Sequence, residues 1–277
     1  MVKFRALRTG FLWCALALAV LLAAATTALA SSADAVWPES SGTNVQSGGK
    51  LVVDASHMDQ GYVMCRVASP SKHGLKMRVV YGDTQLMYSL NQEAEYEVIP
   101  LQLGSGRYEF ALYENVKGSK YSAEGKVSLS VQLSDEDAAY LVTNQYVDYD
   151  LYTAVVQKSD ELCQGMSAAQ DRFNIITRFM TSEFAYDFVR AKTISPGQLP
   201  EIDYCYENRM GICQDLSAVM VCMLRVQGVP CKLVIGYADK YYHAWTSTVI
   251  DGQEVFFDPT AAINALSAKK YTVERIY

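Results

Sequence analysis

Short runs of alternating hydrophobic and polar residues fill the chain between residues 51 and 133. The runs are rich in β-forming residues, and Gly, Asn, Ser or Pro separates them; they cover residues 61–67, 75–81, 95–99, 107–113 and 126–133. Six or so strands in this span predict a small β-sandwich. We expect this all-β domain to cover residues 51–140.

The pattern changes to a helical period after residue 134. Ser134 and the acidic residues behind it resemble the start of a helix, and a tyrosine-rich segment at 144–152 marks a domain junction. Helices are predicted at 153–163 and 168–181. In the second of these, one apolar face is formed by Phe173, Ile176, Phe179 and Met180. We expect a second domain over residues 141–277.

A helix that is apolar on nearly every side is predicted over residues 215–227, which is typical of a buried central helix. Gly228 is suited to end it, and Pro230 follows two residues later. Cys213 therefore lies at the N-terminus of a buried helix, where the helix dipole and free N–H groups favour a thiolate. The same N–H groups can face a developing oxyanion, and Gly211 permits a close approach.

Two strands after this helix bring a histidine and an aspartate together. Asp251-Gly252 is a strong signal for a two-residue hairpin turn between strands 243–250 and 253–258, after a first strand at 231–237. In that register Asp258 opposes Trp245 and lies diagonal to His243 on the same face. Diagonal neighbours are about 7–8 Å apart, within reach of two side chains. A shift by one residue would place them on opposite faces.

The first 30 residues have the features of a secretory signal. Lys3, Arg5 and Arg8 precede an apolar run that ends in Ala28-Leu29-Ala30, a small-x-small cleavage pattern. The alternative is an uncleaved membrane anchor, because residues 11–30 are just long enough to span a bilayer. Residues 31–50 are rich in Ser and Gly and predict a polar linker. We therefore expect an exported protein.

Composition excludes several classes of function. Half of the 277 residues are hydrophobic and 19% are charged, which suits packed domains and not a disordered chain. Loss of residues 1–30 moves the formal net charge from −6 to −9. Such an acidic chain has no electrostatic reason to bind nucleic acid, and we expect a membrane contact only if the signal segment is retained.

Six cysteines follow the signal segment, and their spacing is irregular. There is no CxxC or histidine-rich pattern, so we expect no metal site and no cofactor. Export permits disulfides, and Cys205 with Cys231 is a conceivable pair, but free buried cysteines fit the sequence equally well. Cys222 and Cys231 are interpreted as core residues.

A thiol, an imidazole and a carboxylate in this order are the parts of a cysteine nucleophile with its base and orienting group. Each residue alone has a simpler interpretation, because Cys213 could be a core thiol, His243 a strand residue and Asp258 part of a turn. Their occurrence together favours a catalytic role, since Cys213 starts a helix, Asp258 is in register with His243, and His243 is the only histidine after residue 73. We therefore predict Cys213, His243 and Asp258 as the catalytic residues.

At these residues the chain resembles the transglutaminase-like superfamily. The resemblance is carried by four ordered motifs: Gly211-Ile-Cys213-Gln-Asp, Leu224-Arg-Val-Gln-Gly-Val-Pro-Cys, His243-Ala-Trp and Phe257-Asp-Pro-Thr260. It covers about residues 145–277 and implies an α+β, papain-like domain in which a helix packs on an antiparallel sheet. It assigns Cys213 as nucleophile, His243 as base and Asp258 as orienter. This sequence has no acidic cluster that resembles the calcium sites of animal transglutaminases.

The resemblance implies acyl transfer through a thioester on a protein, peptide or cell-wall peptide. Water as acceptor gives a peptidase or amidase, which we favour slightly, and an amine gives a cross-linking enzyme. Trp245, Tyr204 and Tyr206 are candidate substrate-binding residues, the two tyrosines also as oxyanion donors. The alternative is a non-catalytic binding or adhesion module, which the lack of an identified oxyanion side chain favours.

Overall fold

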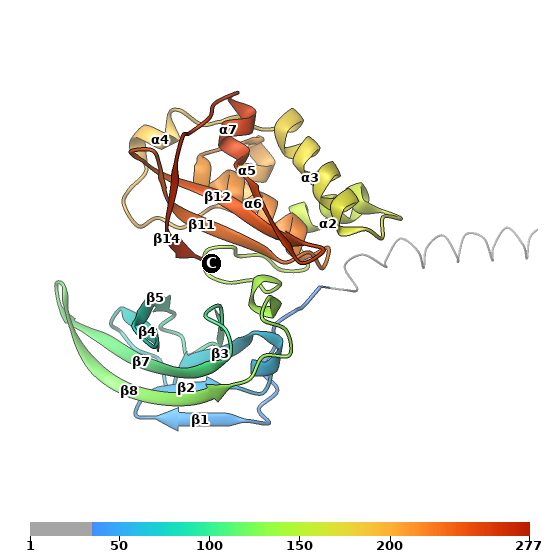
Figure 1. Ribbon diagram of the computed structural model, residues 1–277. Coiled ribbons are helices and arrows are strands. Elements are labelled where there is room, and N and C mark those ends of the chain that lie inside the picture. The colour runs from blue at the N-terminus through green and yellow to red at the C-terminus, as the bar shows by residue number, and fades with distance from the viewer. Residues whose placement is uncertain (1–34) are drawn as a thin grey trace, which may run out of the picture.

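The computed structural model describes residues 35–277, and Figure 1 shows its two parts, one built of strands and the other of helices around a sheet. The predicted signal segment and the first residues of the predicted linker lie outside the described residues. Within the described residues, no helix has the length and apolar character needed to cross a membrane.

The N-terminal part contains two antiparallel four-stranded sheets. One has the strand order β1-β2-β3-β6 and the other β5-β4-β7-β8. The elements are β1 (Val45–Gly48), β2 (Leu51–Asp54), η2 (Met58–Gln60), β3 (Tyr62–Val67), β4 (Leu75–Tyr81), β5 (Thr84–Leu90), β6 (Glu97–Pro100), β7 (Gly106–Lys117), β8 (Lys120–Val131) and η3 (Ala138–Tyr140). Buried side chains of both sheets share one core, which confirms the sheet-rich N-terminal region.

The two sheets meet closely where β1 and β2 pass β8. Lys50 donates its backbone N–H to the Glu124 carbonyl at 2.8 Å. A Cβ at Gly48 would lie 1.9 Å from the Lys126 carbonyl oxygen, and one at Gly125 would lie 2.0 Å from that of Gly48. Glycine is required at both positions because the backbones touch there.

Two local predictions for this part differ from the structure. The polar linker was expected to reach residue 50, but Val45–Gly48 pairs with β2, since backbone pairing does not require apolar side chains. The helix expected to start at Ser134 is a single 3-10 turn, η3, because the capping pattern is not followed by an amphipathic run. The predicted strands at 61–67, 75–81, 95–99, 107–113 and 126–133 overlap β3, β4, β6, β7 and β8.

The C-terminal part is a mixed helix and sheet domain, which confirms the predicted α+β class. Its sheet has the order β13-β12-β11-β14, all pairs antiparallel, and β9 and β10 form a separate parallel pair. The helices are α2 (Ala154–Cys163), α3 (Ala169–Glu183), α4 (Arg190–Thr193), α5 (Ile202–Asn208), α6 (Cys213–Arg225) and α7 (Pro259–Ile263). The strands are β9 (Ala185–Tyr186), β10 (Met210–Gly211), β11 (Cys231–Ala238), β12 (Tyr241–Ile250), β13 (Gln253–Phe257) and β14 (Tyr271–Ile276).

Helix α6 is the buried centre of this domain. From Asp215 to Arg225 every residue is buried, and the helix packs on β11 and β12 on one side and on α2, α3 and α5 on others. The apolar pattern of residues 215–227 predicted this position, and Gly228 follows the helix with φ of 69°. The buried face of α3 is also the predicted one, with Phe173, Ile176, Phe179 and Met180 all buried.

Arg225 is fully buried at the end of α6 and connects three segments. Its guanidinium donates to the carbonyls of Val142 at 2.6 Å, Cys231 at 2.9 Å and Tyr277 at 2.9 Å. These carbonyls belong to the domain junction, the start of β11 and the residue after β14. A single buried charge thus donates to three backbone acceptors, of which the Tyr277 carbonyl also accepts the Leu233 N–H at 2.8 Å.

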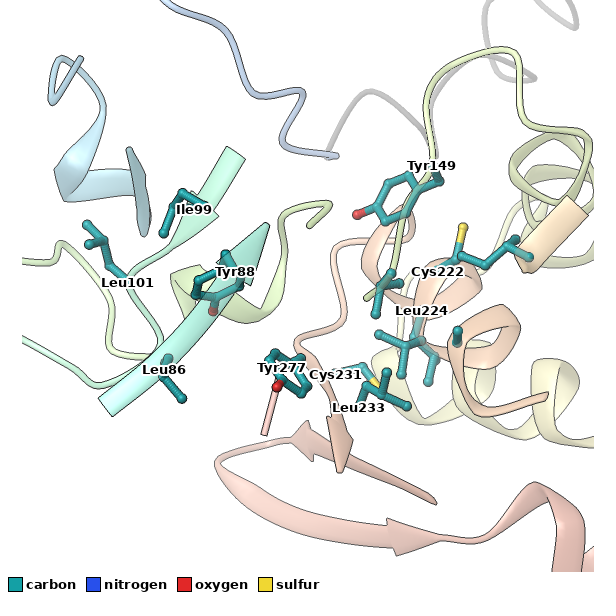
Figure 2. Close-up of a cluster of buried hydrophobic side chains, with 14 of the residues drawn as sticks. Leu86, Tyr88, Ile99, Leu101, Tyr149, Cys222, Leu224, Cys231, Leu233 and Tyr277 are labelled. Carbon is teal, nitrogen blue, oxygen red and sulfur yellow. The ribbon is translucent and has the colours of Figure 1, made fainter. Parts of the chain in front are cut away.

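The two domains are joined by aromatic packing around Tyr277, which Figure 2 shows between Tyr88 of β5 and Leu233 of β11. The Tyr277 ring stacks on Tyr146 with a centroid distance of 3.6 Å and an interplanar angle of 15°. Gln102 accepts a hydrogen bond from the Tyr88 hydroxyl at 3.1 Å and donates to the Ile276 carbonyl. The apolar core therefore continues from the β domain into the sheet that carries the site.

Replacement of Arg225 by Met tests this arrangement. We expect the free energy of unfolding to fall by about 3 kcal/mol, because buried carbonyls lose their donor. Urea unfolding followed by circular dichroism measures the change. Arg178→Met is the matched control: Arg178 is an exposed helix arginine, and its replacement should cost no more than about 0.5 kcal/mol. Equal stability of the two variants would contradict the role of Arg225.

Candidate active site

Cys213 is the first residue of α6, with Ile212 as its extended N-cap residue. The side chain of Asp215 turns back and accepts the Ile212 N–H at 3.1 Å, which closes the first turn. The Cys213 side chain stays partly exposed, whereas the other five cysteines of the described chain are buried, and all six are free. No Cys205–Cys231 disulfide is therefore present.

Gly211 precedes this helix because there is no room for a side chain. A Cβ at this position would lie 2.6 Å from the Cys205 sulfur and 2.9 Å from the Asp215 Cβ. The close approach predicted from the sequence is therefore to the molecule's own core, from α5 and α6. This contact fixes the segment that leads into Cys213.

A buried ion pair fixes the other side of the α6 N-terminus. Arg190 donates through Nε to Asp215 Oδ2 at 3.1 Å and through Nη1 to Glu201 at 3.2 Å. Asp215 also accepts the Glu201 N–H at 3.1 Å. The segment from β9 to α5 is thereby held against the first turn of α6, with Asp187 accepting the N–H groups of Val189 and Arg190.

His243 and Asp258 lie on β12 and directly after β13. His243 Nε2 and Asp258 Oδ2 are 2.8 Å apart, and the same oxygen accepts the Tyr271 hydroxyl at 2.8 Å. The second oxygen, Oδ1, accepts the Ala261 N–H at 2.9 Å, because Asp258 is also the N-cap residue of α7. Both oxygens are occupied, so the carboxylate has one orientation.

The hairpin register that predicted this pair is the observed one. Ile250 opposes Gln253, and the pairing continues in step to Thr246 and Phe257. The ladder ends there, so the expected pairing of Trp245 with Asp258 does not form. Asp258 leaves the strand as a helix cap, because Pro259 has no N–H to continue the ladder and favours the first turn of a helix.

The surroundings of His243 keep its ring protonated at neutral pH. Burial alone would lower the pKa of His243, but hydrogen bonds to Asp258 and Cys213, together with the negative charges of both, raise it to about 9. The pKa of Asp258 is lowered, since the opposing effect of burial is outweighed by the bonds from His243, Ala261 and Tyr271. Because Nε2 faces Asp258, Nδ1 is the nitrogen available to the Cys213 thiol.

A cavity of about 360 Å³ opens beside the His243–Asp258 pair. Tyr186 lines it, and its strand, β9, pairs with β10, the strand that leads into α6. Burial, and after it the negative charges of Cys213 and Asp215, raise the pKa of Tyr186 to about 12. Its hydroxyl is therefore a hydrogen-bond donor at neutral pH.

The three predicted substrate-binding residues, Trp245, Tyr204 and Tyr206, lie outside the cavity lining. Trp245 is buried, with its ring 6.3 Å from that of His243 and 5.0 Å from that of Tyr271, so it supports the triad from behind. Tyr204 and Tyr206 are on α5 and pack against Arg190 and Arg209. None of the three lines the cavity.

Sequence reasoning missed Tyr186 and Tyr271. Both reach the site through strand pairs that no local spacing indicates: β9 with β10, and β14 with β11. Among residues 35–277 no group of three or more His, Cys, Asp or Glu side chains could hold a metal ion.

Comparison with known proteins finds a similarity to one superfamily in this region. Residues 156–259 match the family model of the transglutaminase-like superfamily. No curated protein sequence matches the chain significantly.

Similar solved structures include a proposed cysteine protease from Cytophaga hutchinsonii, at 14% identity and a TM-score of 0.40 over 76% of this chain and 80% of that one. A transglutaminase from red sea bream is similar at 12% identity and a TM-score of 0.30, over 72% of this chain and 47% of that one.

The protonation of His243 can be measured by NMR of ring-labelled histidine. We expect His243 to titrate with a midpoint near pH 9, and Asp258→Asn to lower that midpoint, because the hydrogen-bonded charge is lost. Asp251→Asn, an equal change in the exposed hairpin turn, should leave it in place. The pKa is raised on folding, so its stabilising effect is complete below about pH 6.5 and is lost as the pH rises through about 9. An unchanged titration midpoint in Asp258→Asn would contradict the assignment of Asp258 as the hydrogen-bonded partner of His243.

Proposed function

We propose that the protein is a thiol acyl-transfer enzyme that acts on protein or peptide amides, a proposal supported by the match of residues 156–259 to the transglutaminase-like superfamily. The observation that carries the proposal is the juxtaposition of three groups. Cys213 at the start of a helix contacts His243, which is held by the fully bonded Asp258 carboxylate. This is the arrangement of nucleophile, base and orienting group that acyl transfer requires.

In the first half-reaction the Cys213 thiolate attacks the amide carbon. A C–S bond forms, and the carbonyl electron pair moves onto oxygen. The N–H groups of Cys213 and Gln214 in the first turn of α6 have no intrahelical acceptor and can stabilise this oxyanion. We assign the Tyr186 hydroxyl as a side-chain donor to the same oxygen, since Tyr186 pairs with Gly211, two residues before Cys213, and is near enough for the charge of Cys213 to raise its pKa.

Collapse of this intermediate breaks the C–N bond. The protonated His243 ring gives its proton to the leaving nitrogen, which its raised pKa allows at neutral pH. The neutral ring then takes a proton from water or an amine as that nucleophile attacks the thioester. The C–S bond breaks, and the thiolate and the imidazolium are restored.

We further propose that the enzyme is exported, because residues 1–30 have the charge, the apolar run and the cleavage pattern of a secretory signal. Its substrate would then be an extracellular protein or peptide, or a cell-wall peptide. Hydrolysis is the proposed outcome at the thioester.

Selective thiol labelling tests the nucleophile. We expect iodoacetamide at pH 6.5 to modify Cys213 alone, because burial raises the pKa of the other five thiols and shields them. Mass spectrometry after digestion locates the label. Cys213→Ala should lose both the label and all turnover of peptide amides. Uniform slow labelling of all six cysteines would instead support a non-catalytic binding module.

Tyr186→Phe tests the oxyanion donor. We expect kcat to fall by about 10²-fold with little change in KM, because the donor acts on charge that develops only in the transition state. Tyr237→Phe, a partly exposed tyrosine on β11 that does not line the cavity, is the control and should leave kcat unchanged. An unchanged kcat in Tyr186→Phe would assign oxyanion stabilisation to the backbone alone.

A further inference from the structure

The cavity beside the triad lies on one particular side of the reacting groups. His243, Asp258 and Tyr186 line it, and Cys213 does not. Under the proposed function, on which this inference rests, the acyl carbon is bonded to Cys213 and the leaving nitrogen receives its proton from His243. Atoms beyond that nitrogen therefore extend past His243, into the cavity.

The cavity walls present large apolar side chains to solvent. Phe188 is 63% exposed, Tyr241 67% and Leu266 66%, and all three line the cavity. They come from the segment after β9, the start of β12 and the loop after α7. Exposed apolar side chains that converge on one concave site are typical of a binding subsite.

Three lysines lie close to Asp239, an exposed acidic residue that lines the same cavity, although no lysine lines it. Lys240, Lys269 and Lys270 are exposed and form no salt bridge among residues 35–277. Lys240 Nζ lies 5.3 Å from the ring centroid of Tyr241. The neighbouring Asp239 carboxylate accepts the backbone N–H groups of Lys269 and Lys270, at 3.1 to 3.3 Å.

These charges favour one kind of occupant. Within the cavity, His243 and Asp258 form an ion pair with each other. The Asp239 carboxylate offsets one of the three neighbouring lysine charges, and a positive excess is left to interact with the substrate. This excess attracts an acidic peptide and repels a cationic amine.

We propose that this cavity is the leaving-group subsite of a peptidase. It binds a bulky apolar side chain on the residue that follows the cleaved bond, in a peptide with acidic residues beyond it. The amine of a lysine side chain or a polyamine, which is cationic in solution, is a poor occupant. Water is thus the favoured acceptor of the thioester, which leads to hydrolysis and not to cross-linking.

Quenched fluorescent peptides that differ at two positions test the subsite with the full protein. We expect kcat/KM to be about tenfold or more higher with Phe than with Ala after the cleaved bond. Replacing the downstream Asp by Lys should lower it several-fold at low salt, and this difference should shrink at high salt. Equal rates for Phe and Ala, or for Asp and Lys, would overturn the proposal.

Leu266→Ala should reduce the preference for Phe over Ala to about threefold or less, because kcat/KM for the Phe peptide falls when part of the apolar wall is lost. Leu151→Ala is the matched control, because Leu151 is also exposed but lies outside this cavity. A preference that survives Leu266→Ala unchanged would place the subsite elsewhere. If no peptide is cleaved by the wild-type protein and left intact by Cys213→Ala, there is no cleavage that depends on Cys213. The proposed function then fails, and the subsite fails with it. Cleavage without the expected preferences rejects only the subsite.

Discussion

The site depends on the saturated carboxylate of Asp258. One of its oxygens holds the imidazole of β12 and the hydroxyl of Tyr271 from β14, and the other caps α7. Since it is nearly fully buried, its negative charge is stabilised only by these donors. A rotation that released His243 would also uncap the helix. Catalytic geometry and local folding therefore share the same hydrogen bonds.

The nucleophile is fixed by a different mechanism, the burial of its helix. Helix α6 has no exposed face behind Cys213, and its end is held by Arg225, whose three carbonyl partners span the domain junction, β11 and the residue after β14. The sheet that carries His243 is thereby attached to the same helix that carries Cys213. Alignment of thiol and imidazole follows from core packing, with the pair at the surface end of a rigid helix.

The parts of this arrangement that are local in sequence could be predicted. The apolar run of α6 placed Cys213 at a helix start, and the Asp251-Gly252 turn fixed the register that brings Asp258 to His243. Tyr186 and Tyr271 could not be predicted, because each arrives through a strand pair between segments distant in sequence. The hydrogen bonds of Arg225 could not be predicted either, since a charged residue in an apolar helix does not indicate which backbone carbonyls will accept from it.

The surroundings of His243 separate the two halves of the reaction in space. In the proposed reaction, the acyl group and its oxyanion lie beside Cys213 and the first turn of α6, on the side of the ring that Nδ1 faces. The apolar cavity is lined by His243, Asp258 and Tyr186 and takes the atoms beyond the leaving nitrogen. The departing amine receives the Nδ1 proton, which the raised pKa of His243 keeps on the ring until then. In the proposed scheme the departing amine vacates the cavity, and water then reaches the thioester from the side where the neutral ring acts as base. The choice of acceptor therefore depends on what the cavity walls admit, while the triad chemistry is the same for either acceptor.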